Sequence, residues 1–127
     1  MRKTISLIPV AVLIVFSINF ADAANLSKGK RVFNKCKACH SLVAGKNRVG
    51  PSLKGIFGRK AGSAPKYRYS KAMKKAGSDG LVWSEKTIAK FLVKPRTFIK
   101  RTKMSFAGLK KTTDIKTLLA FLKHATK

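Results

Sequence analysis

Apolar residues recur at helical spacing near both ends of the chain, which predicts a helix at each end. The first helix is expected to begin at Ser27, because a serine there can accept a hydrogen bond from the first turn. The last is expected to be capped by Thr112 or Thr113, with Asp114 at the positive end of the helix dipole. The apolar positions of the two helices are Val32, Phe33, Cys36, Ile115, Leu118, Leu119 and Leu122.

The middle of the chain alternates between loops and shorter helical patterns. Glycine and proline recur every few residues over 41–63, which predicts loops rather than strands. A short helical pattern follows over 69–76. A longer one is expected to begin after Ser84 and to be stopped by Pro95, with Ile88, Phe91 and Leu92 at helical spacing. The chain is therefore predicted to be all-α, and its 127 residues suit one domain.

The first 23 residues have the pattern of a secretory signal peptide. Arg2 and Lys3 precede an apolar run over 7–20, and the small residues of Ala21-Asp22-Ala23 suit cleavage. The run is about 14 residues, shorter than the roughly 18 to 20 that a membrane-spanning helix needs. Cleavage after Ala23 is therefore expected in preference to a retained membrane anchor, which leaves residues 24–127 as the mature domain.

The chain is strongly basic, with 29 Lys and Arg residues against 4 Asp and Glu residues and a net charge of +25. Hydrophobic residues make up 45% of it, which argues against wholesale disorder. A domain of this size buries one modest core while its surface charges repel one another. A disulfide between Cys36 and Cys39 would close only a very small loop, so a different stabilising element is expected.

Cys36-Lys37-Ala38-Cys39-His40 indicates what that element is. Two thiols three residues apart, with an imidazole directly after the second, form the attachment motif of c-type haem. Cys36 and Cys39 would each bond one vinyl group, and His40 would ligate the iron. A thioredoxin-like pair would follow a strand, and none is predicted before Cys36. A zinc site would need further ligands nearby, whereas the only other histidine is the distant His124.

The second axial ligand separates an electron carrier from an open binding or peroxidatic site, because His with Met is the pairing of electron-transfer haems. Met104 lies within 101–108, a stretch that ends in glycine and is predicted to be a loop able to cover a haem face. Met73 lies in the helical pattern over 69–76, where packing is the commoner role. Met104 is therefore the expected ligand, and Met73, His124 or an open position are the alternatives.

Several segments together resemble class I cytochrome c, the cytochrome c of mitochondria and its bacterial relatives. The resemblance extends from about Ser27 to Thr126. It rests on residues 29–33, the motif at 36–40, and 49–53, 58–62, Trp83, 102–108 and 118–122. It implies an all-α fold whose N- and C-terminal helices cross and whose loops enclose one covalent haem c. The residues implied at the crossing are Gly29, Phe33, Leu118 and Phe121.

The resemblance also implies roles for residues around the haem. The Pro51 carbonyl would accept a hydrogen bond from His40, which would fix the imidazole and make it a better ligand. Tyr69 and Trp83 would meet a haem propionate, with Arg59 nearby offsetting its charge. Simple core packing is the alternative role for the two aromatic residues.

Two departures from the mitochondrial pattern concern the surroundings of Met104. Phe91 stands where a tyrosine is usual, so a hydroxyl near the methionine sulfur is missing. Lys100 and Arg101 replace a common Pro-Gly pair, which is expected to affect the stiffness of the loop. Replacement of Met104 by a lysine at alkaline pH is expected to be easier as a result.

The resemblance implies a soluble one-electron carrier, not an enzyme, that works in the bacterial periplasm. It would shuttle between a quinol-oxidising complex and a terminal oxidase or photosynthetic reaction centre, as a monomer without stable membrane insertion. Basic residues around the exposed haem edge would steer it to acidic docking surfaces on those complexes. Those nearest in sequence to the haem segments are Lys35, Lys37, Lys46, Lys94, Arg96, Lys100, Arg101 and Lys103.

Two other functional classes fit parts of the sequence. A haem peroxidase or gas-binding protein would have an open sixth position, whereas Met104 is available here. A nucleic-acid or membrane-surface binder would use the positive charge and owe its haem motif to chance. Export from the cytoplasm argues against nucleic acid as the partner.

Overall fold

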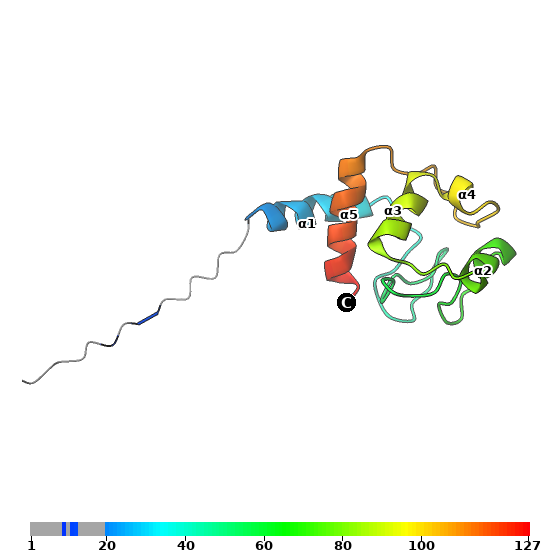
Figure 1. Ribbon diagram of the computed structural model, residues 1–127, viewed down its shortest axis with the longest axis horizontal. Helices are drawn as coiled ribbons and strands as arrows, with labels where there is room; N and C mark the ends of the chain where they lie inside the picture. Colours follow the sequence, from blue (N-terminus) through cyan, green and yellow to red (C-terminus); the bar gives the residue numbers. More distant parts are fainter. Residues whose placement is uncertain (1–8, 10, 13–19) are drawn as a thin grey trace, which may run out of the picture.

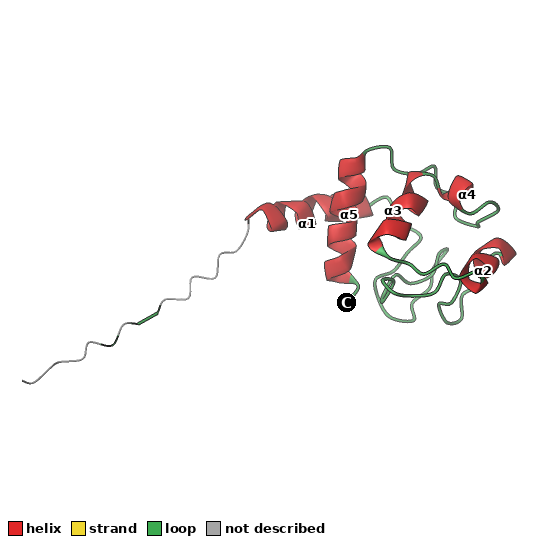
Figure 2. Ribbon diagram, viewed as in Figure 1, coloured by secondary structure: helices red, strands yellow, loops and turns green. Residues whose placement is uncertain are grey.

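The computed structural model describes residues 20–127, together with residues 9, 11 and 12. Helices joined by long loops make up this part of the chain, and its only β-type pairing is one isolated bridge between Lys60 and Val82 (Figure 2). The predicted all-α class is confirmed. In chain order the helices are α1 (Phe20–Phe33), α2 (Lys71–Ser78), α3 (Glu85–Val93), α4 (Pro95–Phe98) and α5 (Thr112–Ala125).

Helices α1 and α5 cross, as the resemblance implied (Figure 1). Gly29 lies at the crossing, where a Cβ atom would collide with the carbonyl oxygen of Thr117. The absent side chain therefore lets the two backbones come close together. Nearby, the rings of Phe33 and Phe121 pack with centroids 5.4 Å apart, and Leu118 is 1% exposed.

The predicted start of the first helix was wrong. Ser27 lies inside α1, which begins at Phe20, so the serine is not its N-cap. The residues before Ser27 include several alanines and no glycine or proline, and Asp22 complements the dipole of the first turn. Helix formation therefore extends N-terminally beyond the serine.

The predicted cap of the last helix was also wrong. Thr112 and Thr113 are already in the first turn of α5, and Lys111 is the N-cap, without a side-chain hydrogen bond to the helix. Lys111 has extended backbone angles, whereas the helix begins at the next residue. The Thr113 carbonyl instead accepts a hydrogen bond from the Thr117 hydroxyl at 3.0 Å.

Helix α3 begins and ends as predicted, and a short helix that was not predicted follows it. Ser84 is its N-cap, and its hydroxyl accepts from the Thr87 backbone N–H while the Thr87 hydroxyl accepts from the Ser84 N–H at 2.7 Å. The helix stops before Pro95, but Pro95 then starts the short helix α4. This agrees with the preference of proline for the first position of a helix, where no hydrogen bond from its nitrogen is needed.

The predicted signal peptide falls mostly outside the described residues, which omit 1–8, 10 and 13–19. The expected cleavage point after Ala23 lies in α1, so cleavage there would remove the first turn of that helix. The helices within the described residues are all too short or too polar to cross a membrane.

Substitution of Gly29 by alanine should destabilise the protein strongly, because the added methyl group would push α1 away from α5. We expect a loss of about 2 kcal/mol or more in the free energy of unfolding, measured by guanidinium titration of the haem-containing protein. Ser27→Ala, at an exposed position of the same helix, should change it by less than about 0.5 kcal/mol. Equal stability of the two variants would contradict the packing at the crossing.

Candidate functional site

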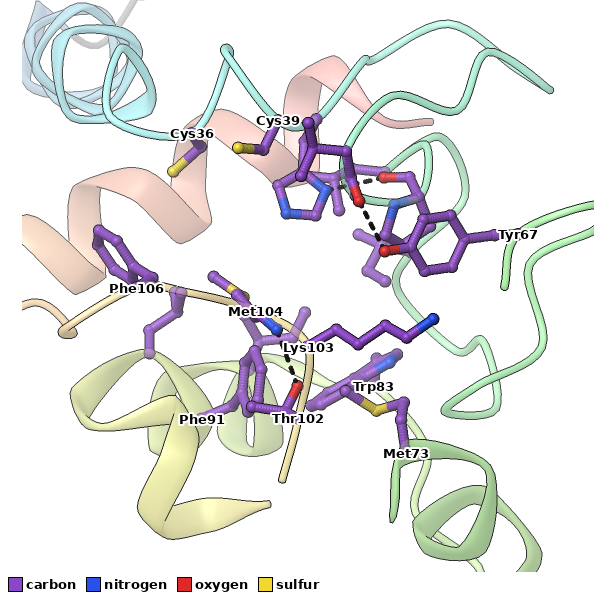
Figure 3. Close-up of a pocket in the computed structure, with 18 of the residues that line it drawn as sticks. Cys36, Cys39, Tyr67, Met73, Trp83, Phe91, Thr102, Lys103, Met104 and Phe106 are labelled. Atoms are coloured by element: carbon purple, nitrogen blue, oxygen red, sulfur yellow. Dashed lines mark hydrogen bonds between the residues drawn. The ribbon is translucent and has the colours of Figure 1, made fainter. Parts of the chain in front are cut away.

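A single cavity of about 240 Å³ brings together all eight predicted site residues. It lies between the loop that follows α1, the loops before and after α2, helices α3 and α5, and the segment after α4. In Figure 3, Cys36 and Cys39 lie across the open space from Met104. The predicted site residues that line it are Cys36, Cys39, His40, Pro51, Arg59, Tyr69, Trp83 and Met104.

The turn that follows α1 presents both thiols and the imidazole to the cavity. The Cys36 N–H donates to the Phe33 carbonyl at 2.8 Å, so the turn continues directly from the end of α1. The His40 N–H then donates to the Cys36 carbonyl at 2.9 Å. Burial, and next the neighbouring Cys39, raise the pKa of Cys36 to about 11. Its sulfur is therefore a protonated thiol at neutral pH.

The imidazole of His40 is fixed in one tautomer by Pro51. The Nδ1 atom lies 2.8 Å from the Pro51 carbonyl oxygen, which can only accept, so Nδ1 carries the proton. Burial lowers the pKa of His40, and the bond to Pro51 only partly opposes this effect. The ring is thus neutral near pH 7, and its Nε2 atom keeps a lone pair that can bind a metal.

Gly50 restrains the same ring from a second side. A Cβ atom at this position would lie 2.8 Å from Nδ1 and 2.9 Å from Nε2 of His40, closer than van der Waals contact permits. The ring therefore packs directly against backbone. The sequence showed Gly50 only as part of the segment 49–53, and no local pattern connected it with His40.

Met104 provides a thioether on the opposite side of the cavity. It is half-buried, in a segment without regular structure, as predicted. The Thr102 N–H closes a turn onto the Ile99 carbonyl at 3.1 Å, and the Lys103 ammonium donates to the Arg68 carbonyl at 2.6 Å. These contacts hold the methionine-bearing segment against the loop that precedes α2.

The two alternative ligands lie in different surroundings. Met73 is 8% exposed, belongs to the hydrophobic core on α2, and also borders the cavity, beside Trp83 in Figure 3. His124 is exposed near the end of α5 and is not among the residues around the cavity. His124 therefore lies outside the cavity, whereas Met104 and Met73 both border it.

Three further predicted site residues add polar groups to the cavity wall. The Arg59 guanidinium donates to the backbone carbonyls of Ser52 at 3.0 Å and Lys54 at 3.3 Å, and burial lowers the pKa of Arg59. The Tyr69 hydroxyl accepts from the Ala64 N–H at 3.1 Å, which leaves its own proton for a further acceptor. Trp83 is 7% exposed, and among the described residues no protein atom accepts from its indole N–H.

Tyr67 is a cavity residue that the sequence reasoning missed. Its hydroxyl donates to the Val49 carbonyl at 2.7 Å, and its ring meets Tyr69 edge-on with centroids 4.7 Å apart. Burial raises the pKa of Tyr67. The only sequence feature that could have indicated Tyr67 was the pair of tyrosines at 67 and 69. This pair does not show that the Tyr67 hydroxyl contacts the segment around Val49.

This donor set fits a covalently attached haem. Two thiols and an imidazole nitrogen come from one turn, a thioether lies opposite, and Tyr69, Trp83 and Arg59 add hydrogen-bond donors to the cavity wall. The remaining walls are largely apolar, as a flat porphyrin requires, and include Phe33, Leu53, Ile56, Ile88, Phe91, Leu92, Phe106, Leu118 and Leu122. The fold and the site together define a c-type haem protein.

Comparison with known proteins identifies the family. The family model named Cytochrome c matches residues 26–126, so the chain belongs to the cytochrome c family. Members of this family bind one covalent haem c and are electron carriers, not enzymes, and Cys36 and Cys39 have the spacing that this attachment needs.

Bacterial and eukaryotic relatives share most of the sequence. Cytochrome c2 of Afifella marina is 54% identical over 99 residues, covering 77% of this chain and 80% of the relative. Cytochrome c of Sesamum indicum is 38% identical over 112 residues, covering 87% of this chain and 98% of the relative. Among solved structures, cytochrome cH from Methylobacterium extorquens superposes with a TM-score of 0.71 at 38% identity, covering 78% of this chain and 97% of that one.

The departure at Lys100 and Arg101 has a visible backbone consequence. Arg101 has a φ angle of +65°, in the left-handed region where glycine is favoured. A side chain in this conformation costs roughly 1–2 kcal/mol. The segment that carries Met104 therefore contains backbone strain that a glycine would not have.

Replacement of Arg101 by glycine should relieve this strain. We expect Arg101→Gly to raise the free energy of unfolding of the haem-containing protein by about 1 kcal/mol relative to Arg101→Ala. Both variants remove the same charge, so the comparison isolates the backbone effect. Guanidinium titration measures the difference, and an alanine variant as stable as the glycine variant would show that position 101 is unstrained.

Proposed function

We propose that this protein carries single electrons in the bacterial periplasm between a quinol-oxidising complex and a terminal oxidase or photosynthetic reaction centre. One observation carries the proposal: the Cys36–His40 turn and Met104 face each other across one cavity whose walls are largely apolar. His40 and Met104 would be the iron ligands, and Cys36 and Cys39 the attachment points. The cytochrome c2 relatives support this type of role.

The chain contributes a fixed environment to electron transfer. When bound, haem supplies a one-electron couple between ferric and ferrous iron. Pro51 and Gly50 hold the imidazole of His40 in one orientation, and the bond from Lys103 to Arg68 holds the opposite segment. The buried rings of Trp83 and Phe91 pack with centroids 5.1 Å apart and form part of the cavity wall. Small structural change between oxidation states favours rapid transfer.

The proposed ligand role of Met104 predicts a spectroscopic loss. Met104→Ala should abolish the weak near-infrared band of the oxidised protein that arises from a thioether on ferric iron, because it removes the thioether that we propose as the ligand. Met73→Leu keeps the volume of the other cavity methionine and should retain the band. A band that survived in Met104→Ala and disappeared in Met73→Leu would reassign the ligand to Met73. An open-site haem protein would lack the band from the start.

Signal-peptide cleavage and covalent haem attachment together predict the mass of the mature protein. The protein recovered from the periplasm should have the mass of residues 24–127 plus one haem, measured by intact mass spectrometry under denaturing conditions. A mass that included residues 1–23 would contradict cleavage after Ala23. A mass equal to the bare polypeptide would contradict covalent haem and, with it, the electron-carrier function.

The distribution of charge supports docking to acidic surfaces. After Asp22, the only acidic residues are Asp79, Glu85 and Asp114. Asp79 pairs with Lys75 at 2.6 Å and Glu85 with Lys123 at 3.1 Å, so two of these carboxylates are locally neutralised. Lys35 and Lys103 border the cavity, and Cys39 is exposed at its edge. The accessible edge of the site is therefore positively charged.

If partners dock at the positively charged edge of the cavity, the effect of reversing one charge should depend on where that charge lies. Lys35→Glu should slow electron transfer to membranes that contain a cytochrome c oxidase, measured at low ionic strength, because it weakens attraction at the cavity edge. Lys60→Glu makes the same change in net charge at an exposed residue away from the cavity and should slow it less. Equal slowing would indicate that only the overall charge matters. High salt should reduce both effects.

A further inference from the structure

The peptide unit that joins Pro51 to Ser52 is hydrogen-bonded at both ends. Its carbonyl oxygen lies 2.8 Å from Nδ1 of His40. Its N–H, which belongs to Ser52, donates to Oδ1 of Asn47 at 3.0 Å. Because a peptide unit is planar and its N–H and C=O point in opposite directions, the bond to Asn47 restricts the direction of the carbonyl that meets His40.

Ser52 anchors the same unit through its other polar atoms. It is 4% exposed. Its hydroxyl donates to the Val43 carbonyl at 2.6 Å and accepts from the Lys54 N–H at 3.2 Å. Its own carbonyl accepts from the Arg59 guanidinium at 3.0 Å. All polar groups of Ser52 are thus engaged by neighbouring segments.

The Pro51–Ser52 peptide depends on these contacts because it lies in a loop, where no regular backbone hydrogen bonds of a helix or strand hold it. Proline has no N–H, so Pro51 cannot anchor itself by a backbone donor. On its other side, the Gly50 N–H donates to the Cys39 carbonyl at 2.8 Å. The carbonyl of Pro51 is therefore held between two fixed points, one on the thiol-bearing turn and one on Asn47.

We propose that Asn47 and Ser52 are positioning residues that orient the imidazole of His40 through the Pro51–Ser52 peptide. The proposal deepens the proposed function, since it rests on His40 being an iron ligand. The bond from Asn47 polarises the peptide as well as orienting it, which strengthens the acceptor that His40 meets. A stronger acceptor at Nδ1 makes the imidazole a better electron donor at Nε2.

Asn47 also makes a second contact, which gives a competing explanation. Its side-chain amide donates to the Pro65 carbonyl at 3.0 Å and so joins two loops. A purely structural role would consist of this link. It predicts that loss of Asn47 lowers stability without changing His40, whereas the positioning role predicts a change at the imidazole itself.

The test uses the haem-containing protein with Asn47→Ala and Asn47→Asp. The aspartate keeps the acceptor for the Ser52 N–H but loses the donor to Pro65. For Asn47→Ala we expect hydrogen exchange at the His40 Nδ1–H of the reduced protein, followed by NMR, to be about tenfold faster, and the reduction potential to rise. For Asn47→Asp we expect exchange close to that of the unchanged protein, even if stability falls through loss of the Pro65 contact.

Thr117→Val serves as the matched control. It removes a buried hydroxyl that is bonded within α5, at 3.0 Å to Thr113 and 3.2 Å to Asp114, and should leave exchange at His40 unchanged. If Asn47→Ala does not fold, Ser52→Ala takes its place and should also speed exchange.

The positioning role would be overturned if Asn47→Ala lost stability but kept the exchange rate and potential of the unchanged protein. Exchange accelerated as much by Asn47→Asp as by Asn47→Ala would overturn it as well. Both results count only in variants that retain covalent haem and the near-infrared methionine band. A failure of the proposed function would instead appear as the absence of one of those two features in the unchanged protein.

Discussion

The close approach of α1 and α5 at Gly29 is the constraint on which the site depends. The thiol-bearing turn begins where α1 ends, through the bond from the Cys36 N–H to the Phe33 carbonyl. Helix α5 contributes Leu118 and Leu122 to the cavity wall. The distance between the two helices therefore determines where the thiols lie relative to the rest of the site. A side chain at position 29 would change that distance.

The long loops are held largely by side chains that donate to backbone carbonyls. His40 donates to Pro51, Tyr67 to Val49, Arg59 to Ser52 and Lys54, and Lys103 to Arg68. These carbonyls belong to segments that have no helix or strand ladder to satisfy them. Some of the basic residues thus organise the cavity walls as well as contributing positive charge.

Because the protein carries a large excess of positive charge, its stability depends on the hydrophobic core and on the packing around the cavity. The ion pairs of Lys75 with Asp79 and Lys123 with Glu85 are exposed, and such pairs contribute little. The apolar residues of the core meet around a space that the protein alone does not fill. A flat apolar group bonded to the thiols would complete this packing. The covalent haem c of this family would then be the additional stabilising element that the composition predicts.

The sequence alone determined the properties that depend on local spacing: the attachment motif at 36–40, the core faces of α3 and α5, and the loop around Met104. The start of α3 was predicted correctly, but the starts of α1 and α5 were not. Ser27 and Thr112 have only a weak local preference for the N-cap position, and the conformation of the neighbouring backbone decided where each helix begins. The resemblance to cytochrome c implied the contact between Pro51 and His40, but only the tertiary structure packed Gly50 against His40 and joined Asn47 to the Pro51–Ser52 peptide. Chain folding sets these contacts between distant residues, and helical periodicity or motif spacing contains no information about them.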